Sequence, residues 1–388
     1  MLSLKRYMFG GKRKTNKRNI KTKTKKITTK TLNNLLRPYI FTNPLKTDIL
    51  TNSKQIGPKE YGELSLKLFN SNNGKVYKRE SDKIIKNAKN GLGKLILYMN
   101  FKSHNILNKE KRAKLYNIIS KYNPDIICLS EALLPVSIKN NKLASGKATV
   151  VEISGIKDDT ISQPYKAATE FAIKKKADYG EDGMNVKGVW KSFFIGEGYK
   201  YIVFGNPSEC PWGENWGNCI ITKTKPDDAY VLQMKSYGKK SFNEPESRCL
   251  VSIKIGDELI CTTHLENRIA ESRQKQTNEI INFLKKQKKN FKKITLVADL
   301  NAVNKKSYTK EELKILKLLN FGQIPVPSDS VDIINNSGLI GSKPINTGQK
   351  YESLFQKCVS HCYSTTYKKS CMVFTDATDF DHQAICVW

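Results

Sequence analysis

The sequence predicts a mixed α/β fold whose strands end in polar residues, and three patterns support this fold class. Residues 95–131 read as strand, helix and strand, and residues 249–263 read as a hairpin. Residues 294–298 form an apolar run that stops at a polar pair. Strands that alternate with a helical pattern are typical of α/β domains. A chain of 388 residues suits one large domain with a tail, or two domains.

The apolar run at residues 294–298 is the centre of this pattern. Asp299 and Asn301 follow it, with one residue between them. Because side chains alternate along a strand, both polar side chains are expected on the same side. The carboxylate offers a base or a metal ligand beside a neutral donor. The alternative is a plain strand end that turns, since Asp and Asn are common turn residues.

The N-terminal part of the chain is strongly basic. The first 40 residues contain thirteen Lys or Arg and no acidic residue, in a chain with a formal net charge of +31. We predict a basic, disordered tail over residues 1–40, a linker or surface-packed extension over residues 41–90, and a folded domain over residues 91–388. The tail charge favours attraction to nucleic acid or to an anionic membrane surface. A solvated tail or an import signal explains the charge equally well.

Apolar segments and cysteines indicate the compartment. The chain shows no signal-peptide core and no run of about 18 apolar residues. We therefore expect a soluble intracellular protein of the cytoplasm or nucleus, not secreted and without a transmembrane segment. Six of the nine cysteines lie in apolar, strand-like runs, which fits a reducing compartment. The alternative is a zinc set whose spacing matches no standard motif: Cys358, His361, Cys362 and Cys371.

The strand–helix–strand unit opens the folded domain. Residues 95–99 predict a buried strand that ends at Asn100, and residues 126–129 predict another that ends at Ser130 and Glu131. The helix between them has apolar residues at helical spacing: Leu115, Ile118, Ile119 and Tyr122. Asn123-Pro124 ends that helix. Taken alone, Glu131 would be an exposed loop carboxylate.

The next elements are less regular. Residues 135–200 are expected to form loops and insertions on the domain surface. Residues 201–204 and 219–221 predict strands, joined by a loop that holds Trp216 and Asn218. A tryptophan there suits stacking on a base or a lipid, or closing the edge of a core.

The second half of the domain begins with the hairpin. Residues 249–255 and 258–263 flank Gly256-Asp257, a two-residue turn that hairpins favour, and the second strand ends at His264. A helix follows, preceded or begun by polar residues: Arg268, Arg273 and Gln276. The chain closes with strands near residues 372–374 and 384–387, separated by a polar loop with Asp381 and His382.

Polar residues therefore gather at strand ends along the whole domain: Asn100, Glu131, His264, Asp299, Asn301, Asp381 and His382. Such groups suit a hard divalent cation together with a phosphate ester. Carboxylates with few soft ligands favour Mg²⁺ over zinc.

Five segments in order resemble the endonuclease/exonuclease/phosphatase superfamily, to which deoxyribonuclease I belongs. The segments are Leu97-Tyr98-Met99-Asn100, Asn123 to Glu131, Thr263-His264-Leu265, Ala298-Asp299-Leu300-Asn301-Ala302 and Asp381-His382-Gln383-Ala384-Ile385. The resemblance covers residues 91–388. The chain departs from the family pattern at Ser130, where Gln is usual, and at Ala298, where Gly is usual. Glu352 stands at the nearest counterpart of a family Asp.

The resemblance implies an α/β (α+β) fold, a four-layered sandwich of two mostly antiparallel β-sheets flanked by helices. It implies a Mg²⁺ site, which Mn²⁺ can also fill, with the ligands Glu131, Asn100 and Asp381. Asp299 would orient or deprotonate water, Asn301 would donate to a nonbridging oxygen, and Glu352 would hold an imidazole. His264 and His382 would contact the phosphoryl group. The expected substrate-binding residues are Arg268, Arg273, Trp216 and Asn218.

The motifs predict the type of reaction better than the substrate. We expect a Mg²⁺-dependent, monomeric phosphodiesterase acting on nucleic acid, and Thr263-His264-Leu265-Glu266 resembles the tyrosyl-DNA phosphodiesterase branch. The alternative is a phosphoinositide or inositol polyphosphate phosphatase, or a sphingomyelinase-like lipid phosphodiesterase. A third reading is a noncatalytic binding protein on the same fold, and Glu131, Asp299, Asn301 and His382 argue against it. The lysine- and asparagine-rich composition resembles that of large DNA virus proteins.

Overall fold

The computed structural model describes the following residues: 94–101, 106–135, 137–138, 145–162, 185–208, 215–237, 247–266, 269–302, 330–337, 340–341, 360–365, 371–373 and 385–387. The predicted tail and linker lie outside these residues, as do four predicted site residues: Arg268, Glu352, Asp381 and His382.

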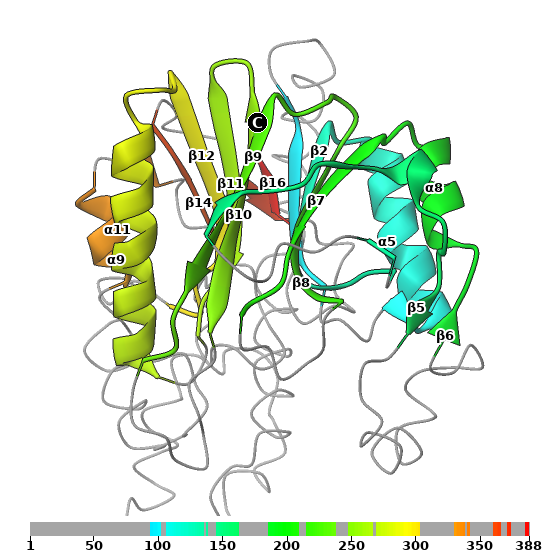
Figure 1. The fold of residues 1–388 in the computed structure, drawn as a ribbon, viewed down its shortest axis with the longest axis horizontal. Coiled ribbons are helices and arrows are strands. Elements are labelled where there is room, and N and C mark those ends of the chain that lie inside the picture. The colour runs from blue at the N-terminus through cyan, green and yellow to red at the C-terminus, as the bar shows by residue number, and fades with distance from the viewer. Residues whose placement is uncertain are drawn as a thin grey trace, which may run out of the picture.

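Two seven-stranded sheets form the centre of the described part of the chain (Figure 1). The first sheet has the order β15 (Cys371–Val373), β16 (Ile385–Val387), β1 (Ile96–Asn100), β2 (Ile126–Leu133), β8 (Trp216–Thr222), β7 (Tyr201–Gly205) and β4 (Val151–Glu152). The second has the order β13 (Ile340–Gly341), β14 (Ser360–Ser364), β12 (Lys293–Asp299), β11 (Glu258–His264), β10 (Arg248–Ile255), β9 (Asp228–Met234) and β3 (Gly146–Lys147). A separate pair joins β5 (Ile161–Ser162) to β6 (Asn185–Val186).

Each sheet contains one parallel pair, and its other described pairings are antiparallel. The parallel pairs are β1 with β2 and β11 with β12. A helix connects the strands of each pair, because parallel neighbours need a crossover connection. These helices are α5 (Lys109–Tyr122) and α9 (Ala270–Gln287). Both pairs therefore bring the carboxyl ends of two strands together.

The helices cover the outer faces of the two sheets. Figure 1 shows α5 and α8 (Trp190–Gly196) beyond the first sheet, and α9 and α11 (Ser330–Asn335) beyond the second. The order is helices, sheet, sheet, helices. The predicted four-layered sandwich of mostly antiparallel sheets is confirmed.

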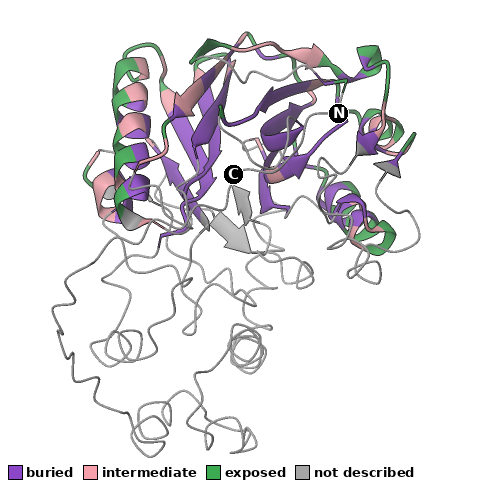
Figure 2. Cartoon of the chain, turned by 60° about the horizontal axis from the view of Figure 1, so that its bottom comes forward, coloured by how far each residue is buried: buried purple, intermediate pink, exposed green. Residues whose placement is uncertain are grey.

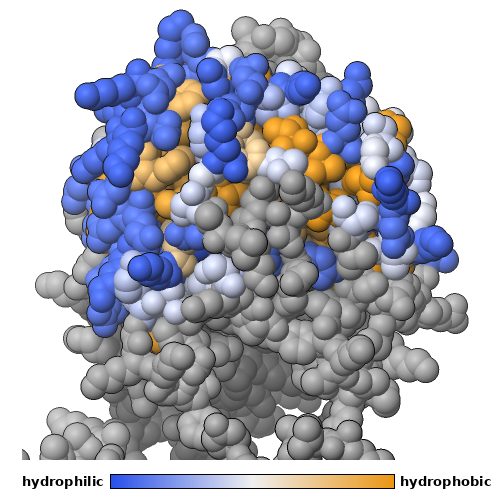
Figure 3. All heavy atoms as spheres, in the orientation of Figure 1, coloured by the Kyte–Doolittle hydropathy of each residue, from blue (hydrophilic) through white to orange (hydrophobic). Residues whose placement is uncertain are grey.

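Three apolar clusters hold these layers together, and Figure 2 shows the strands as the most buried elements. The middle cluster lies between the sheets, with Ile96, Cys128 and Ile220 from the first and Val251 and Val297 from the second. Along each strand, alternate residues enter this cluster and the others face the helices, as the period of two requires. Figure 3 shows hydrophilic residues gathered over the outer side of α9.

The ends of α5 follow from its sequence. The side chain of Asn108 caps the first turn by accepting from the Lys111 amide at 3.0 Å, an interaction worth about 1 kcal/mol in such positions. The helix stops at Asn123, which takes a left-handed conformation with φ of 46°. Asparagine tolerates that conformation better than most residues. The predicted helix and its end are confirmed.

The expectation that residues 135–200 form only surface loops is wrong at α8. Trp190 and Phe194 are 1% and 0% exposed, and Phe193 stacks on Tyr116 of α5 with ring centroids 3.7 Å apart. The helix has seven residues and no side-chain cap, so its local signal is weak. Aromatic packing against α5 stabilises it instead. The short strands β3, β4, β5 and β6 and the 3₁₀ turn Ile153–Gly155 also fall in this region.

Two further expectations concern the cysteines and the membrane. Cys128, Cys219, Cys249, Cys261 and Cys362 are buried and free, and they pack as small apolar side chains, as predicted for four of them. Within the described residues, none of the helices combines the length and apolarity that crossing a membrane needs.

Candidate functional site

The polar ends of the two parallel strand pairs meet at one edge of the sandwich. In the first sheet Asn100 lies beside Ser130, and in the second His264 lies beside Asp299. These four positions continue the strand faces that point between the sheets, where Tyr98, Cys128 and Val297 belong to the middle cluster. Folding thus converts four polar strand ends, far apart in sequence, into one group.

Asn100 joins the two sheets at this group. Its amide nitrogen donates to Asp299 Oδ2 at 3.0 Å and to Glu131 Oε1 at 3.2 Å. Two carboxylates from different sheets therefore converge on one amide group. Asn100 is 2% exposed and Asp299 is 0% exposed, so this contact lies in a low-dielectric environment where hydrogen bonds to charged groups are strong.

Glu131 owes its position to an irregular strand. The pairing of β2 with β8 shifts register between Leu129 and Ala132, which is a β-bulge, and Glu131 lies within it with φ of 51°. A glutamate in the left-handed region is uncommon, and bulges often redirect a side chain beside a functional site. The Glu131 side chain keeps 25% exposure. The bulge thus directs one carboxylate toward both the site and the solvent.

Asp299 and Asn301 converge by a different route from the predicted one. Strand β12 ends at Asp299, and Asn301 has φ of 45° in the bend that follows. The Asn301 backbone amide donates to Asp299 Oδ1 at 2.9 Å, so the pair forms the turn that was the alternative interpretation. Both side chains nevertheless approach His264. The same two residues therefore form the turn and belong to the site.

His264 is the hub of the described site. Its Nδ1 lies 3.7 Å from Glu131 Oε1, and its Nε2 lies 3.7 Å from Asp299 Oδ2 and 2.8 Å from Asn301 Nδ2. Asn301 Nδ2 also donates to the Leu265 carbonyl at 2.8 Å, which establishes it as the amide nitrogen because a carbonyl can only accept. Asn301 therefore donates to His264 Nε2, which accepts through its lone pair.

Arg248 is a part of the site that the sequence interpretation missed. Its Nη1 lies 3.5 Å from His264 Nδ1, and its guanidinium lies 5.9 Å from the centre of the Trp216 ring. Its position could have been inferred from the sequence, because the two-residue turn fixes the pairing register of the hairpin. The observed pairing of Leu250 with Thr263, continued by two residues, sets Arg248 beside the end of β11.

Tyr98 and Ser130 lie directly behind these groups. The Tyr98 hydroxyl donates to Ser130 Oγ at 3.0 Å. Burial raises the pKa of Tyr98 well above its ordinary value, and the nearby Asp299 carboxylate adds to the shift. Tyr98 therefore stays protonated and remains a donor.

Three residues predicted to bind substrate are buried in the structure. Asn218 donates to the Cys249 carbonyl at 2.9 Å, and Trp216 is 6% exposed at the start of β8. Arg273 is 1% exposed and donates to the Glu266 carbonyl at 3.1 Å. Burial lowers the pKa of Arg273, and the carboxylates of Glu266 and Asp299 oppose that shift. Substrate binding by these residues stays a prediction, and Asn218 also lies with its amide nitrogen 3.7 Å from Cys249 Sγ.

Comparison with known proteins gives structural matches only. No protein-family model and no curated protein matches the sequence. An endonuclease/exonuclease/phosphatase protein from Beutenbergia cavernae matches with 13% identity and a TM-score of 0.45, covering 76% of this chain and 70% of that one. A 3'-5' exonuclease from Neisseria meningitidis has 13% identity and a TM-score of 0.45, over 76% and 98%. A mannosyl-6-phosphatase from Bacteroides thetaiotaomicron has 12% identity and a TM-score of 0.41, over 76% and 99%.

The fold resembles that of endonuclease/exonuclease/phosphatase proteins. The matched structures include a protein named for the superfamily that the five motifs resemble. Similarity at this level concerns the fold alone, and membership of the tyrosyl-DNA phosphodiesterase branch stays a prediction.

The donor atoms of the site suit a hard cation. Glu131 offers a partly exposed carboxylate, and the Asn100 amide nitrogen is engaged, so its carbonyl oxygen is the atom suited to a metal. Mg²⁺ commonly uses one or two carboxylates and keeps several waters. The described residues contain no group of three or more Asp, Glu, His or Cys arranged around a metal, and Asp381 lies outside them.

The zinc set proposed for the C-terminal cysteines has no support among the described residues. His361 donates from Nε2 to the Ala302 carbonyl at 2.8 Å, while Cys362 belongs to the middle apolar cluster. As neighbours on β14 they face opposite ways.

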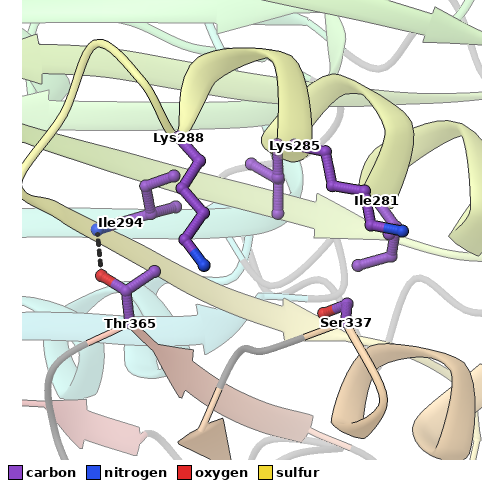
Figure 4. Close-up of a pocket in the computed structure, with 7 residues that line it drawn as sticks. Ile281, Lys285, Lys288, Ile294, Ser337 and Thr365 are labelled. Carbon is purple, nitrogen blue, oxygen red and sulfur yellow. Dashed lines mark hydrogen bonds between the residues drawn. The ribbon is translucent and has the colours of Figure 1, made fainter.

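A hollow between α9 and the start of β12 is separate from the site. Figure 4 shows Ile281, Ile294, Lys285 and Lys288 lining it, with Thr365 accepting from the Ile294 amide at 3.0 Å. Ile294 and Asp299 are at opposite ends of β12, about 16 Å apart at the rise of an extended strand.

Proposed function

We propose that this chain is a divalent-metal-dependent phosphodiesterase that acts on nucleic acid. The observation that supports it most directly is the convergence of Glu131 and Asp299, from different sheets, on the amide nitrogen of Asn100. His264 and Asn301 complete the group. An acidic pair beside an imidazole supplies what phosphodiester hydrolysis needs: a metal ligand, a base and a group to meet developing charge.

Glu131 and Asn100 would hold Mg²⁺ or Mn²⁺ on the first-sheet side, with Asp381 as the third predicted ligand. When bound, the metal would polarise the phosphoryl oxygen and stabilise charge on the leaving oxygen. The partial exposure of Glu131 leaves its carboxylate open to solvent and substrate.

Asp299 would act on the attacking water as an orienting group or base. The Asn100 side chain and the Asn301 amide donate to its two oxygens, which holds the carboxylate in one orientation before substrate arrives. Preorganisation of this kind reduces the cost of reaching the transition state. Asn301 also donates to His264 Nε2, so we assign to Asn301 the positioning of the imidazole. To donate to a nonbridging oxygen of the substrate, as predicted, the Asn301 side chain would have to give up its hydrogen bond to His264 or to the Leu265 carbonyl.

Nucleic acid is the substrate class that the charge of the chain favours. The formal net charge of +31 predicts salt-sensitive binding to a polyanion. The proposal is tested with a substrate panel in Mg²⁺: plasmid, abasic-site duplex, 5′-tyrosyl DNA, inositol phosphates and sphingomyelin vesicles. We expect turnover of a nucleic-acid substrate, abolished by EDTA and restored by Mg²⁺ or Mn²⁺.

Other outcomes of the panel decide between the alternatives. Turnover of inositol phosphates or sphingomyelin alone would replace nucleic acid by a lipid or inositol substrate while keeping the chemistry. Activity that persists undiminished in EDTA would overturn the metal-dependent mechanism. Absence of turnover on every substrate, with intact fold by circular dichroism, would favour the noncatalytic reading.

A further inference from the structure

A chain of buried hydroxyl groups connects the two sheets just behind the site. Tyr98 donates to Ser130 Oγ at 3.0 Å, and Ser130 donates to the Thr263 carbonyl at 3.3 Å. Tyr98 and Ser130 belong to the first sheet and Thr263 to the second. All three residues are 0% exposed. We call this chain of hydrogen bonds the hydroxyl bridge.

The bridge joins the residues that immediately precede two site residues. Ser130 comes directly before Glu131, and Thr263 comes directly before His264. The space between the sheets is otherwise filled mainly by apolar side chains, which pack without fixing the angle of any polar group. Hydrogen bonds are directional, so the Ser130–Thr263 bond sets the spacing of β2 and β11 where Glu131 and His264 leave them.

The rest of the bridge region supports the same reading. The Phe101 amide donates to the Ser130 carbonyl at 2.9 Å, holding the end of β1 to the same residue. The Thr263 hydroxyl and Asn218 both donate to the Cys249 carbonyl at 2.9 Å. Gly205 permits close packing nearby, since a Cβ there would lie 2.7 Å from Val251 Cγ2. The Asn218 bond thus crosses between the sheets, while the other two hold Ser130 and Thr263 within their own sheets.

We infer that Ser130 is a positioning residue, which holds Glu131 at its working distance from His264 through the hydroxyl bridge. The catalytic part of this inference rests on the proposed function. Ser130 touches no substrate in this scheme and acts through the backbone of its neighbour. Displacement of a reacting group by about 1 Å can cost about 10²-fold in rate, so a single buried hydroxyl has a measurable effect.

Thr262 provides a matched control. It lies on β11, is 0% exposed, and its hydroxyl has no hydrogen-bond partner within the described part of the chain. Thr262→Val therefore removes a buried hydroxyl from β11 without breaking a hydrogen bond. Ser130→Ala, by contrast, breaks the bridge and leaves the Tyr98 hydroxyl without its acceptor, which carries its own stability cost.

The first experiment measures hydrolysis of bis(p-nitrophenyl) phosphate in Mg²⁺, together with urea unfolding. We expect Ser130→Ala to lower kcat by about 10- to 100-fold with little change in KM, and Thr262→Val to retain the wild-type rate. Ser130→Cys, a weaker donor of similar size, should lie between. Adding Tyr98→Phe to Ser130→Ala removes the hydroxyl that has lost its acceptor, but it also removes the hydrogen bond of that hydroxyl with the Asp299 backbone, so the double variant should not recover the rate. Equal rate losses in Ser130→Ala and Thr262→Val, or a rate that recovers with stability, would overturn the inference.

The second experiment is independent of activity. Hydrogen exchange is followed at the amides of Phe101 and Leu265, which donate to Ser130 and Asp299 at the site edge, and of Lys292, which donates to Asp257 at the opposite end. We expect Ser130→Ala to speed exchange at Phe101 and Leu265 by about fivefold, the equivalent of one net hydrogen bond of about 1 kcal/mol. Lys292 should be unaffected.

The two experiments distinguish failure of the proposed function from failure of the hydroxyl bridge. Faster exchange in a protein that hydrolyses nothing would leave the bridge established and the proposed function rejected. Unchanged exchange in Ser130→Ala would reject the bridge, whatever the wild-type protein hydrolyses.

Discussion

The two sheets contribute unequal halves to the site. The first sheet supplies Asn100 and Glu131, and the Glu131 side chain is 25% exposed on a bulged strand. The second supplies His264, Asp299 and Asn301, whose side chains are buried and joined to one another. An ion and its waters need an open carboxylate, whereas a proton-transfer group benefits from a dry, fixed environment. The difference in burial thus predicts a division of labour.

Both halves place a residue in the left-handed backbone region. Among non-glycine residues of the described chain, positive φ occurs at Asn123, Glu131 and Asn301. Asn123 ends a helix, which accounts for its conformation. Glu131 takes it inside the β-bulge and Asn301 in the bend closed on Asp299, and both lie in the site. Uncommon conformations of this kind persist where the surrounding structure determines them, often at functional sites.

The largest loss of turnover is expected at Glu131, the partly exposed carboxylate of the first sheet. Glu131→Gln keeps the shape of the side chain but removes its charge, so turnover should fall by about 10³-fold or more, as when a key electrostatic group at a metal is lost. The Mg²⁺ concentration for half-maximal rate should rise, while the urea midpoint stays near wild type. Measuring rate against Mg²⁺ concentration checks this. Full activity of Glu131→Gln would show that the catalytic metal is not bound by Glu131 of the first sheet.

A change at Asp299, in the buried second-sheet part of the site, should affect the chemical step rather than metal binding. Asp299→Asn should reduce the single-turnover rate by about 10²- to 10⁴-fold, the range for loss of a positioned acid or base, with little change in Mg²⁺ dependence. Because the Asn100 side chain and the Asn301 amide donate to the two oxygens of Asp299, the new amide nitrogen would face one of these donors, and urea unfolding of Asp299→Asn measures the cost of that clash. If Asp299→Asn instead weakens Mg²⁺ as strongly as Glu131→Gln does, the division of labour is incorrect.

A smaller effect is expected at Asn301, because it acts through His264. Asn301→Ala should lower the rate by about 10²-fold, near the lower end for loss of one preorganised donor. In a His264→Gln background the same change should cost much less, since residues acting as a unit are not additive. A double-mutant cycle on single-turnover rates measures the coupling. Strictly multiplicative losses would indicate that Asn301 and His264 work separately.

The smallest effect concerns the left-handed residue outside the site. Asn123→Ala should destabilise the domain by about 1–2 kcal/mol, the cost of that conformation for an ordinary residue, whereas Asn123→Gly should be close to neutral. Neither should change kcat. Urea unfolding and turnover on the same samples provide the comparison, and a change in kcat at Asn123 would show that backbone conformation does not distinguish the site from the rest of the chain.

Much of the fold could be predicted because its signals are local. The β10–β11 hairpin follows from apolar alternation around Gly256-Asp257, and Gly256 has φ of 60°. Helix α5 follows from helical spacing and ends at Asn123 as expected. In contrast, α8 was missed because its stability comes from packing against α5 rather than from caps or length. Strand β9 was also missed, since four of its seven residues are only partly buried and its apolar pattern is weak.

Sequence patterns alone were enough to locate the polar strand ends at Asn100, Glu131, His264 and Asp299, because each follows an apolar run and the period of side chains can be read from the sequence. They also indicated that Asp299 and Asn301 belong together. The tertiary structure decided which of these residues meet, since Asn100 reaches Asp299 only when two sheets pack face to face. It also decided the bulge at Glu131, the contacts of His264 with Asn301 and the presence of Arg248. Those features depend on contacts between distant segments, and no local propensity encodes a contact that only packing creates.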